Sequence, residues 1–107
     1  MFTRIVDFIG TRGKTRDLKE AIQTKILPIL RGQPGFVDEI VLESDIEPDR
    51  VLALSFWRSR EDAERYNREQ HSKVKESLRG MLESEPVVKT FNVTSSTAHK
   101  IAPGKAA

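Results

Sequence analysis

The sequence predicts an α+β fold with the order β-α-β-β-α-β, in which a four-stranded antiparallel sheet carries two helices on one face. Segments rich in β-branched and aromatic residues predict strands over residues 2–9, 36–44, 50–57 and 87–94. Helical periodicity fills the first and third intervals between these strands. The second interval is the stretch DIEPD, which favours a hairpin. This order is that of a ferredoxin-like fold, and right-handed crossovers place both helices on the same sheet face.

The first strand alternates. Phe2, Val6 and Phe8 share one side, and Ile5 and Ile9 share the other. A turn over residues 10–13 follows.

The first helix is predicted from Thr15, as N-cap, through Leu30, and we expect it to end near Gly32. Pro28 removes one backbone donor and should bend or loosen the last turn. The helical spacing is carried by Leu18, Ala21, Ile22, Ile26 and Ile29.

The two middle strands are apolar on both sides, whereas a strand with one wet face alternates apolar with polar residues. In the second strand, Phe36, Ile40 and Leu42 oppose Val37 and Val41. The third strand opposes Val51, Ala53, Ser55 and Trp57 to Leu52, Leu54 and Phe56. A monomer would leave the helix-free face in water as a large apolar patch. We therefore expect a homodimer through that face.

The second helix is predicted to begin at Ser59, with Asp62 completing a capping-box-like pair, and to run to about Glu83. Its apolar stripe comprises Ala63, Tyr66, Val74, Leu78 and Met81. Residues 1–94 thus form one domain, and residues 95–107, STAHKIAPGKAA with the preceding Ser, are expected to be a flexible tail.

Composition narrows the function. The 107 residues include no Cys and only two His, without metal-ligand spacing, so no metal site is expected. Basic and acidic residues are interleaved between residues 58 and 79, which is typical of a solvated helix and not of a nucleic-acid surface. The chain has no membrane-length apolar run, and charges interrupt its N-terminal segment, so we expect a cytoplasmic protein with no membrane partner.

The segments QPGFVDEIVLES and LALSFWRSREDAERY resemble the antibiotic biosynthesis monooxygenase (ABM) family, over about residues 2–94. The most specific elements of the resemblance are Pro34-Gly35-Phe36 and Trp57 followed by Ser59 and Glu61-Asp62-Ala63. It implies a dimeric α/β barrel with a ferredoxin-like protomer. Related barrels include cofactor-free monooxygenases, haem-degrading enzymes and isomerases, so the motifs predict the fold more than the reaction.

The stretch FWRSREDAERYNREQH holds the only Trp, the only Tyr and one His. Trp57 either fills the core or walls a pocket, and Tyr66 either is buried with a satisfied hydroxyl or lines that pocket. Asn67 and Gln70 either mark a helix break or face a cavity holding something polar. His71 is either an exposed or capping residue, or a catalytic one.

Asp7 interrupts the first strand on the side of Ile5 and Ile9. A carboxylate there must be paired or have a raised pKa, so it is a candidate proton acceptor. Asp7 and His71 are our candidate bases, and Trp57, Tyr66, Asn67 and Gln70 our candidate substrate-pocket residues.

The resemblance then suggests a cofactor-free monooxygenase acting on an aromatic or quinol-like small molecule. The alternative is a non-catalytic small-molecule-binding or accessory dimeric barrel. No cofactor is expected. Haem-degrading relatives resemble one another in an Asn on the first strand and a Trp and a His on the second helix. Counted without gaps, this sequence has Asp7, Tyr66 and Glu76 at these positions. All three differ, so we do not expect a haem-degrading enzyme.

Overall fold

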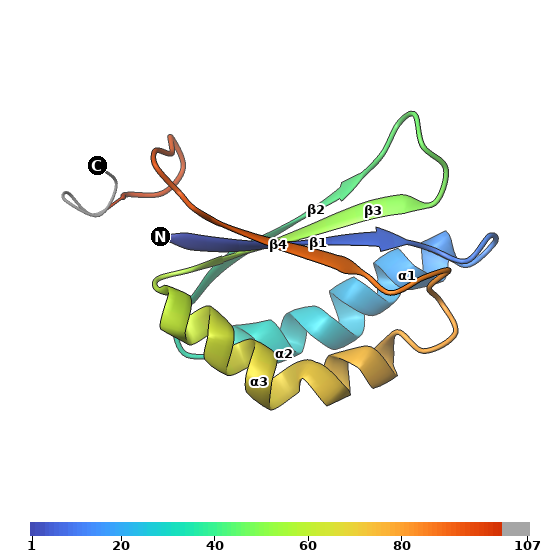
Figure 1. Ribbon diagram of the computed structural model, residues 1–107, viewed down its shortest axis with the longest axis horizontal. Helices are drawn as coiled ribbons and strands as arrows, with labels where there is room; N and C mark the ends of the chain where they lie inside the picture. Colours follow the sequence, from blue (N-terminus) through green and yellow to red (C-terminus); the bar gives the residue numbers. More distant parts are fainter. Residues whose placement is uncertain (102–107) are drawn as a thin grey trace.

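A computed structural model describes residues 1–101 and has the predicted ferredoxin-like α+β architecture. The strand order is β2-β3-β1-β4, and every neighbouring pair is antiparallel. All the helices lie on one side of the sheet (Figure 1). The strands are β1 (Phe2–Ile9), β2 (Phe36–Glu43), β3 (Arg50–Trp57) and β4 (Val87–Asn92).

The first helix is interrupted by a π-helical turn. It comprises α1 (Thr15–Ala21), η1 (Ile22–Ile26) and α2 (Leu27–Arg31). The wide turn lies just before Pro28, whose ring would clash with the carbonyl four residues earlier in a regular helix. The loosening expected from Pro28 is therefore present, one turn earlier than predicted.

The prediction that Thr15 caps this helix was wrong. The N-cap residue is Lys14, and it makes no side-chain cap hydrogen bond. The Thr15 hydroxyl instead donates to Asp49 Oδ1 at 2.6 Å, which ties the helix start to the turn before β3.

The second helix, α3 (Arg60–Ser77), begins as predicted, because Ser59 Oγ accepts a hydrogen bond from the Asp62 amide at 3.2 Å. It ends six residues before the expected Glu83. Leu78 leaves the helical conformation (φ −106°, ψ 7°), and Gly80 then adopts a left-handed φ of 79°. The helix is continuous through Gln70, so the two amides do not mark a break.

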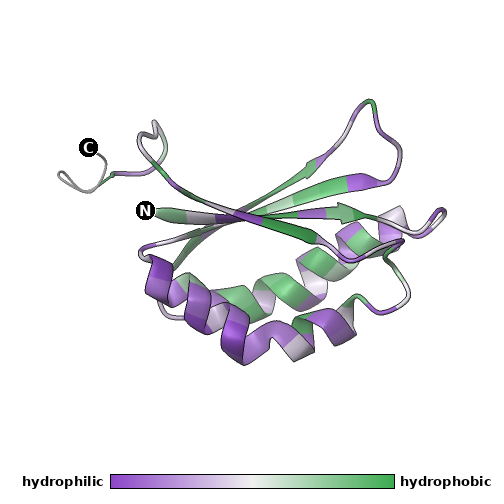
Figure 2. Ribbon diagram, viewed as in Figure 1, coloured by the Kyte–Doolittle hydropathy of each residue, from purple (hydrophilic) through white to green (hydrophobic). Residues whose placement is uncertain are grey.

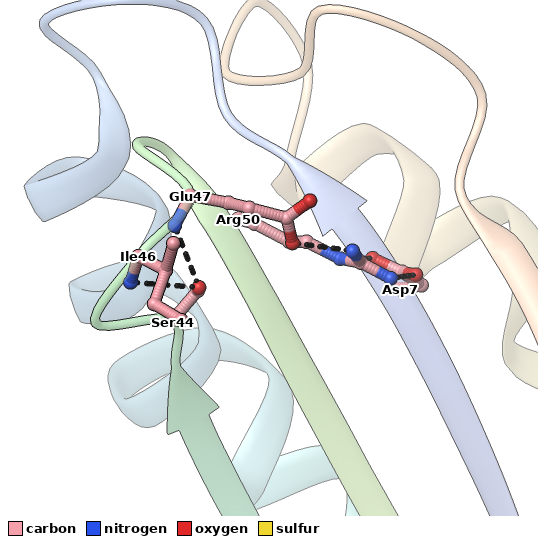
Figure 3. Close-up of polar contacts among 5 residues, drawn as sticks. All are labelled: Asp7, Ser44, Ile46, Glu47 and Arg50. Atoms are coloured by element: carbon pink, nitrogen blue, oxygen red, sulfur yellow. Dashed lines mark hydrogen bonds and ion pairs between the residues drawn. The ribbon is translucent and has the colours of Figure 1, made fainter.

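The predicted hairpin joins β2 to β3. Ser44 Oγ accepts hydrogen bonds from the amides of Ile46 (3.2 Å) and Glu47 (2.9 Å), which closes the turn (Figure 3). Asp49 completes it with φ 67°, a conformation that Asp tolerates better than most residues.

The predicted grouping of Phe36 with Ile40 and Leu42 on one side of β2 was wrong, because the register shifts at the start of this strand. Between Phe36 and Asp38 the ladder is irregular, so that Phe36 pairs with Trp57 and Asp38 with Phe56. Phe36 therefore packs on the helix side, edge-on to Trp57 at 5.7 Å, and not with Ile40 and Leu42 on the other side. Gly35 precedes this bulge with φ 80°, and a Cβ there would lie 2.0 Å from Asp62 Oδ2, so only glycine fits.

The core lies between the sheet and the helices. In β3 the buried set is Val51, Ala53, Ser55 and Trp57, while Leu52, Leu54 and Phe56 face the helix-free side. Figure 2 shows α3 as mostly hydrophilic, whereas the first helix carries both hydrophobic and hydrophilic segments. The buried core from the other elements consists of Phe2, Phe8, Leu18, Ala21, Ile22, Ile26, Leu30, Ala63, Tyr66 and Leu78.

The helix-free face leaves large apolar side chains in solvent. Phe91 is 50% exposed and Val87 54%. Ile9, Ile40 and Leu42 are also exposed on this side. None of the helices within residues 1–101 is both long and apolar enough to cross a membrane.

One residue of the predicted tail, His99, contacts this face. His99 Nε2 is 3.2 Å from Asp38 Oδ2, and its ring lies 6.1 Å from that of Phe56. The rest of the predicted tail, residues 102–107, lies outside the described residues.

Candidate functional site

A cavity of about 740 Å³ lies between the helix-bearing face of the sheet and the helices. That volume is typical of small-molecule sites. Its walls are mostly apolar, and the π-helical turn contributes Ile22 and Ile26. The other apolar lining residues include Val6, Phe8, Leu30, Ala53, Val74, Leu78, Leu82 and Val88.

Three polar side chains cross the sheet side of the cavity in a single row. Ser55 on β3 is in register with Arg4 on β1 and with Glu39 on β2, and all three line the cavity. Strands are about 4.8 Å apart, so the backbone positions of Arg4 and Glu39 are separated by about 10 Å. The row therefore presents a cation, a hydroxyl and a carboxyl group to whatever occupies the cavity. We call these three residues the polar row.

Arg4 is the cation of the polar row. Its Nη2 donates to Asn67 Oδ1 at 3.2 Å, and its guanidinium carbon lies 5.7 Å from the centre of the Tyr66 ring. Desolvation by burial lowers the pKa of Arg4. No carboxylate among residues 1–101 lies within ion-pair distance of it. A partly buried charge is costly unless it is paired, so this arrangement suits an anionic ligand atom.

Glu39 is the carboxyl group of the polar row. Burial raises the pKa of Glu39 to about 7, and the neighbouring charge of Asp38 adds to the increase. Its carboxylate makes no ion pair with any residue in the described part of the chain. A carboxyl group with a pKa near neutrality has the properties of a general base or acid.

Tyr66 closes the helix side of the polar row. It is buried, and its ring stacks on Trp57 with centroids 5.1 Å apart. Burial raises the pKa of Tyr66 to about 12, so its phenol stays neutral at physiological pH. Tyr66 is thus a wall with a hydroxyl and not a base.

Trp57 and Ser55 are linked within β3. Trp57 Nε1 donates to Ser55 Oγ at 2.9 Å, and both side chains are buried. The Ser55 carbonyl accepts from Thr3 Oγ1, also at 2.9 Å, which binds β3 to β1 at this point.

The structure brings only part of the predicted site together. Tyr66, Asn67 and His71 line the cavity from α3, with Asn67 and His71 exposed at its rim. Trp57 is fully buried behind Ser55 and is not part of the lining, and neither is the half-buried Gln70.

Asp7 lies on the helix-free face, away from the cavity, because it is in register with Leu52. Its carboxylate is paired with Arg50, at 2.7 Å between Oδ2 and Nη2. Of the two alternatives given for Asp7, an ion-paired carboxylate or one with a raised pKa, the structure shows the ion pair.

Sequence reasoning missed all three members of the polar row. The signal was present, because Arg4 lies between Phe2 and Val6 in strand alternation, and Glu39 between Val37 and Val41. These are the same interruptions of an apolar strand face that drew attention to Asp7.

Within residues 1–101, no three His, Cys, Asp or Glu side chains are grouped so as to hold a metal ion. The polar side chains that line the cavity include the polar row and the neighbouring Tyr66, Asn67 and His71. Ser72, Lys75, Glu76, Arg79, Ser84 and Glu85 also belong to the lining.

Comparisons with known proteins agree with the fold. A family model described as antibiotic biosynthesis monooxygenase matches residues 1–75. The structure of SnoaB, a cofactor-independent oxygenase from Streptomyces nogalater, is similar with a TM-score of 0.75 and 14% identity, covering 92% of this chain and 97% of that one. The structure of a protein of unknown function from Nitrosomonas europaea is similar with a TM-score of 0.75 and 13% identity, covering 96% of this chain and 95% of that one. The structure of a protein from Shewanella oneidensis has a TM-score of 0.71 and 20% identity, covering 84% of this chain and 87% of that one. No curated protein matches the chain.

Proposed function

Because the chain belongs to the antibiotic biosynthesis monooxygenase family, we propose that its cavity binds an electron-rich phenol or quinol and promotes oxidation of that molecule by dioxygen without a bound cofactor. The observation that carries this proposal is the polar row. It places a cation and a carboxyl group, neither of which forms an ion pair within residues 1–101, along one side of a mostly apolar cavity. The similarity to a cofactor-independent oxygenase supports the same class of reaction.

The chemistry needs only a proton acceptor and a dry, well-shaped site. Removing the phenolic proton gives an electron-rich phenolate, which can transfer electrons to dioxygen itself. Conversion of a phenol with a free para carbon into a quinone consumes one dioxygen and releases one water, and the substrate supplies every electron and both hydrogens. A quinol instead loses two electrons and its two hydroxyl hydrogens to one dioxygen, which gives the quinone and hydrogen peroxide. The protein contributes orientation, desolvation and a base.

Glu39 is the proton acceptor in this proposal. With a pKa of about 7 it is partly ionised at neutral pH and still basic enough to accept a proton from a phenol held beside it. His71 lines the same cavity from the exposed rim, where an imidazole would exchange the proton with solvent. Asp7 has no part in the reaction, because it faces the other side of the sheet.

Arg4 stabilises the phenolate. Its guanidinium lacks a carboxylate partner within residues 1–101 and lines the cavity, so a negative oxygen that forms there gains a charge-assisted hydrogen bond. Stabilising the charge that develops during a reaction is a major source of rate acceleration in enzymes.

The protein acts as a homodimer in this proposal, through the helix-free face. That face carries several large side chains near half exposure, among them Ile40, Val87 and Phe91. Their burial against a second copy is favourable at about 25 cal/mol per Å² of apolar surface.

Oxygen uptake over a panel of hydroquinones and naphthols tests the reaction. We expect uptake with the wild-type protein, its loss in Glu39→Gln, and its retention in Asp7→Asn. Binding without oxygen uptake would favour the alternative, a non-catalytic binding or accessory protein. A pocket closed by Tyr66 and Met81 would also have favoured that alternative, and the open volume of about 740 Å³ does not.

A further inference from the structure

Trp57 has no place in the proposed reaction, although it is the only Trp of the chain and is fully buried. Its one polar atom donates to Ser55 Oγ at 2.9 Å. An indole N–H is a donor only, so the direction of this hydrogen bond is fixed by chemistry. Ser55 Oγ must be the acceptor.

A serine hydroxyl has two lone pairs and one hydrogen. The Trp57 indole occupies one acceptor direction, which leaves the hydrogen pointing elsewhere. Among residues 1–101, no side chain or carbonyl accepts a hydrogen bond from the Ser55 hydroxyl. Ser55 lines the cavity and is otherwise buried, with 6% of its surface exposed. The hydroxyl hydrogen therefore has an acceptor only when something in the cavity provides one.

We propose that Trp57 orients the Ser55 hydroxyl as a hydrogen-bond donor into the cavity, where it selects ligands that place an acceptor oxygen at the centre of the polar row. Ser55 is then a specificity-determining residue that contacts the ligand. Trp57 is a positioning residue, which acts through Ser55 and does not touch the ligand. The inference rests on the proposed function only for the class of ligand, an oxygen-bearing aromatic molecule.

The selectivity follows from the cost of an unpaired donor. A phenol or phenolate oxygen beside Ser55 accepts from the hydroxyl and lies next to Arg4 in the register. A hydrocarbon of the same shape would cover the hydroxyl without accepting its hydrogen. Sites that bury a hydrogen-bonding group reject analogues that leave it unpaired.

A matched pair of probes measures this selectivity without turnover. The probes are 1-naphthol and 1-methylnaphthalene, which have nearly the same shape and differ by the oxygen. Their dissociation constants are compared under anaerobic conditions for the wild-type protein and its variants. We expect the wild-type protein to prefer 1-naphthol, and Ser55→Ala to reduce that preference about tenfold through weaker 1-naphthol binding alone. Ser55→Thr, which keeps the hydroxyl, should retain most of the preference.

Trp57→Phe removes the indole N–H and keeps an aromatic ring. We expect it to reduce the preference for 1-naphthol several-fold while 1-methylnaphthalene binds as before. Should this variant fail to fold, the single indole N–H resonance of the wild-type protein gives a second measurement. A ligand that accepts from Ser55 polarises the chain of hydrogen bonds, so 1-naphthol should move that resonance downfield more than 1-methylnaphthalene does.

Three results would overturn the inference: equal affinity of the wild-type protein for the two probes, no detectable binding of 1-naphthol, or an unchanged preference in Ser55→Ala. A folded Trp57→Phe variant with the full preference would overturn the role of Trp57. The two proposals can be tested separately. If the preference for 1-naphthol depends on Ser55 but no oxygen is consumed, only the proposed reaction is disproved. If Ser55→Ala consumes oxygen and keeps the full preference for 1-naphthol, only the role of Ser55 is disproved.

Discussion

Arg50 binds both carboxylate oxygens of Asp7 across the β1–β3 pair, with Nε 3.1 Å from Oδ1 and Nη2 2.7 Å from Oδ2 (Figure 3). Hydrogen bonds to Asp7, and then to Glu47, raise the pKa of Arg50. This fork-like geometry is among the stronger forms of ion pair. The carboxylate that interrupts the first strand therefore supports the sheet and does not serve the cavity.

Asp7→Asn should lower the thermal midpoint of unfolding by a few degrees, because the bidentate pair becomes a weaker neutral contact. Binding of 1-naphthol should not change. Differential scanning calorimetry and titration calorimetry measure the two effects. Glu47→Gln is the matched control, since it removes the other, exposed partner of Arg50 and should have a smaller effect. A loss of naphthol binding in Asp7→Asn would contradict this assignment.

Glu39→Gln should change how stability depends on pH. With its pKa raised from 4.5 to about 7 in the folded state, Glu39 keeps a proton that the unfolded chain releases between these values. The folded state binds more protons there, so the contribution of Glu39 to stability falls as the pH rises from about 4.5 to about 7.

The glutamine variant should therefore be more stable than the wild-type protein at pH 8, by about 1–2 kcal/mol after allowance for solvent screening, and nearly equal to it at pH 4. Urea unfolding at both pH values measures the difference. Glu43→Gln, at an exposed position of the same strand, should show no such gain. Parallel pH profiles for Glu39→Gln and the wild-type protein would contradict the raised pKa.

Arg4→Met should weaken binding of the 1-naphtholate anion about tenfold, because the cavity loses its only cation on the polar row. Affinity for 1-methylnaphthalene should stay the same or rise. Titration calorimetry above the pKa of naphthol measures both. Arg60→Met is the matched control, since Arg60 is exposed and lies over the Phe2 ring, away from the cavity lining. Equal losses in the two variants would indicate a non-specific charge effect.

Ile40→Asp should convert the proposed dimer into a monomer, because it buries an uncompensated carboxylate at the helix-free face. Light scattering at micromolar concentration measures the mass. Ile46→Asp, at a loop position that is 85% exposed, is the control and should remain dimeric. A well-folded wild-type monomer would remove the argument for the interface.

Truncation after Thr94 should lower the thermal midpoint by no more than a few degrees. The described tail residues contribute one His99–Asp38 contact and the packing of the His99 ring near Phe56, both at the surface. Calorimetry of the truncated chain measures the shift. Because Phe56 belongs to the helix-free face, loss of the dimer on truncation would instead show that the tail contributes to the interface.

The order of the helices and strands could be predicted from the sequence. Strand alternation separated Phe2, Val6 and Phe8 from Ile5 and Ile9, and Ser59 marked the start of α3. These features depend on residues that are neighbours in the chain, so they can be predicted from the sequence. The end of α3 was predicted less accurately, because the apolar stripe continues through Leu78 and Met81, whereas the regular helix ends at Ser77.

Which side of the sheet forms the candidate site depends on tertiary packing. Both alternate sets of each middle strand are apolar, so alternation grouped the residues without showing which group the helices cover. The bulge after Phe36 then exchanged that residue between the groups. Arg4, Ser55 and Glu39 form a row because hydrogen-bond register aligns three strands that are distant in sequence. Asp7 interrupts an apolar strand face in the same way as Arg4 and Glu39, but its side chain points to the opposite side of the sheet, because successive side chains of a strand alternate between the two faces. Which of these faces lines the cavity depends on how the helices pack on the sheet.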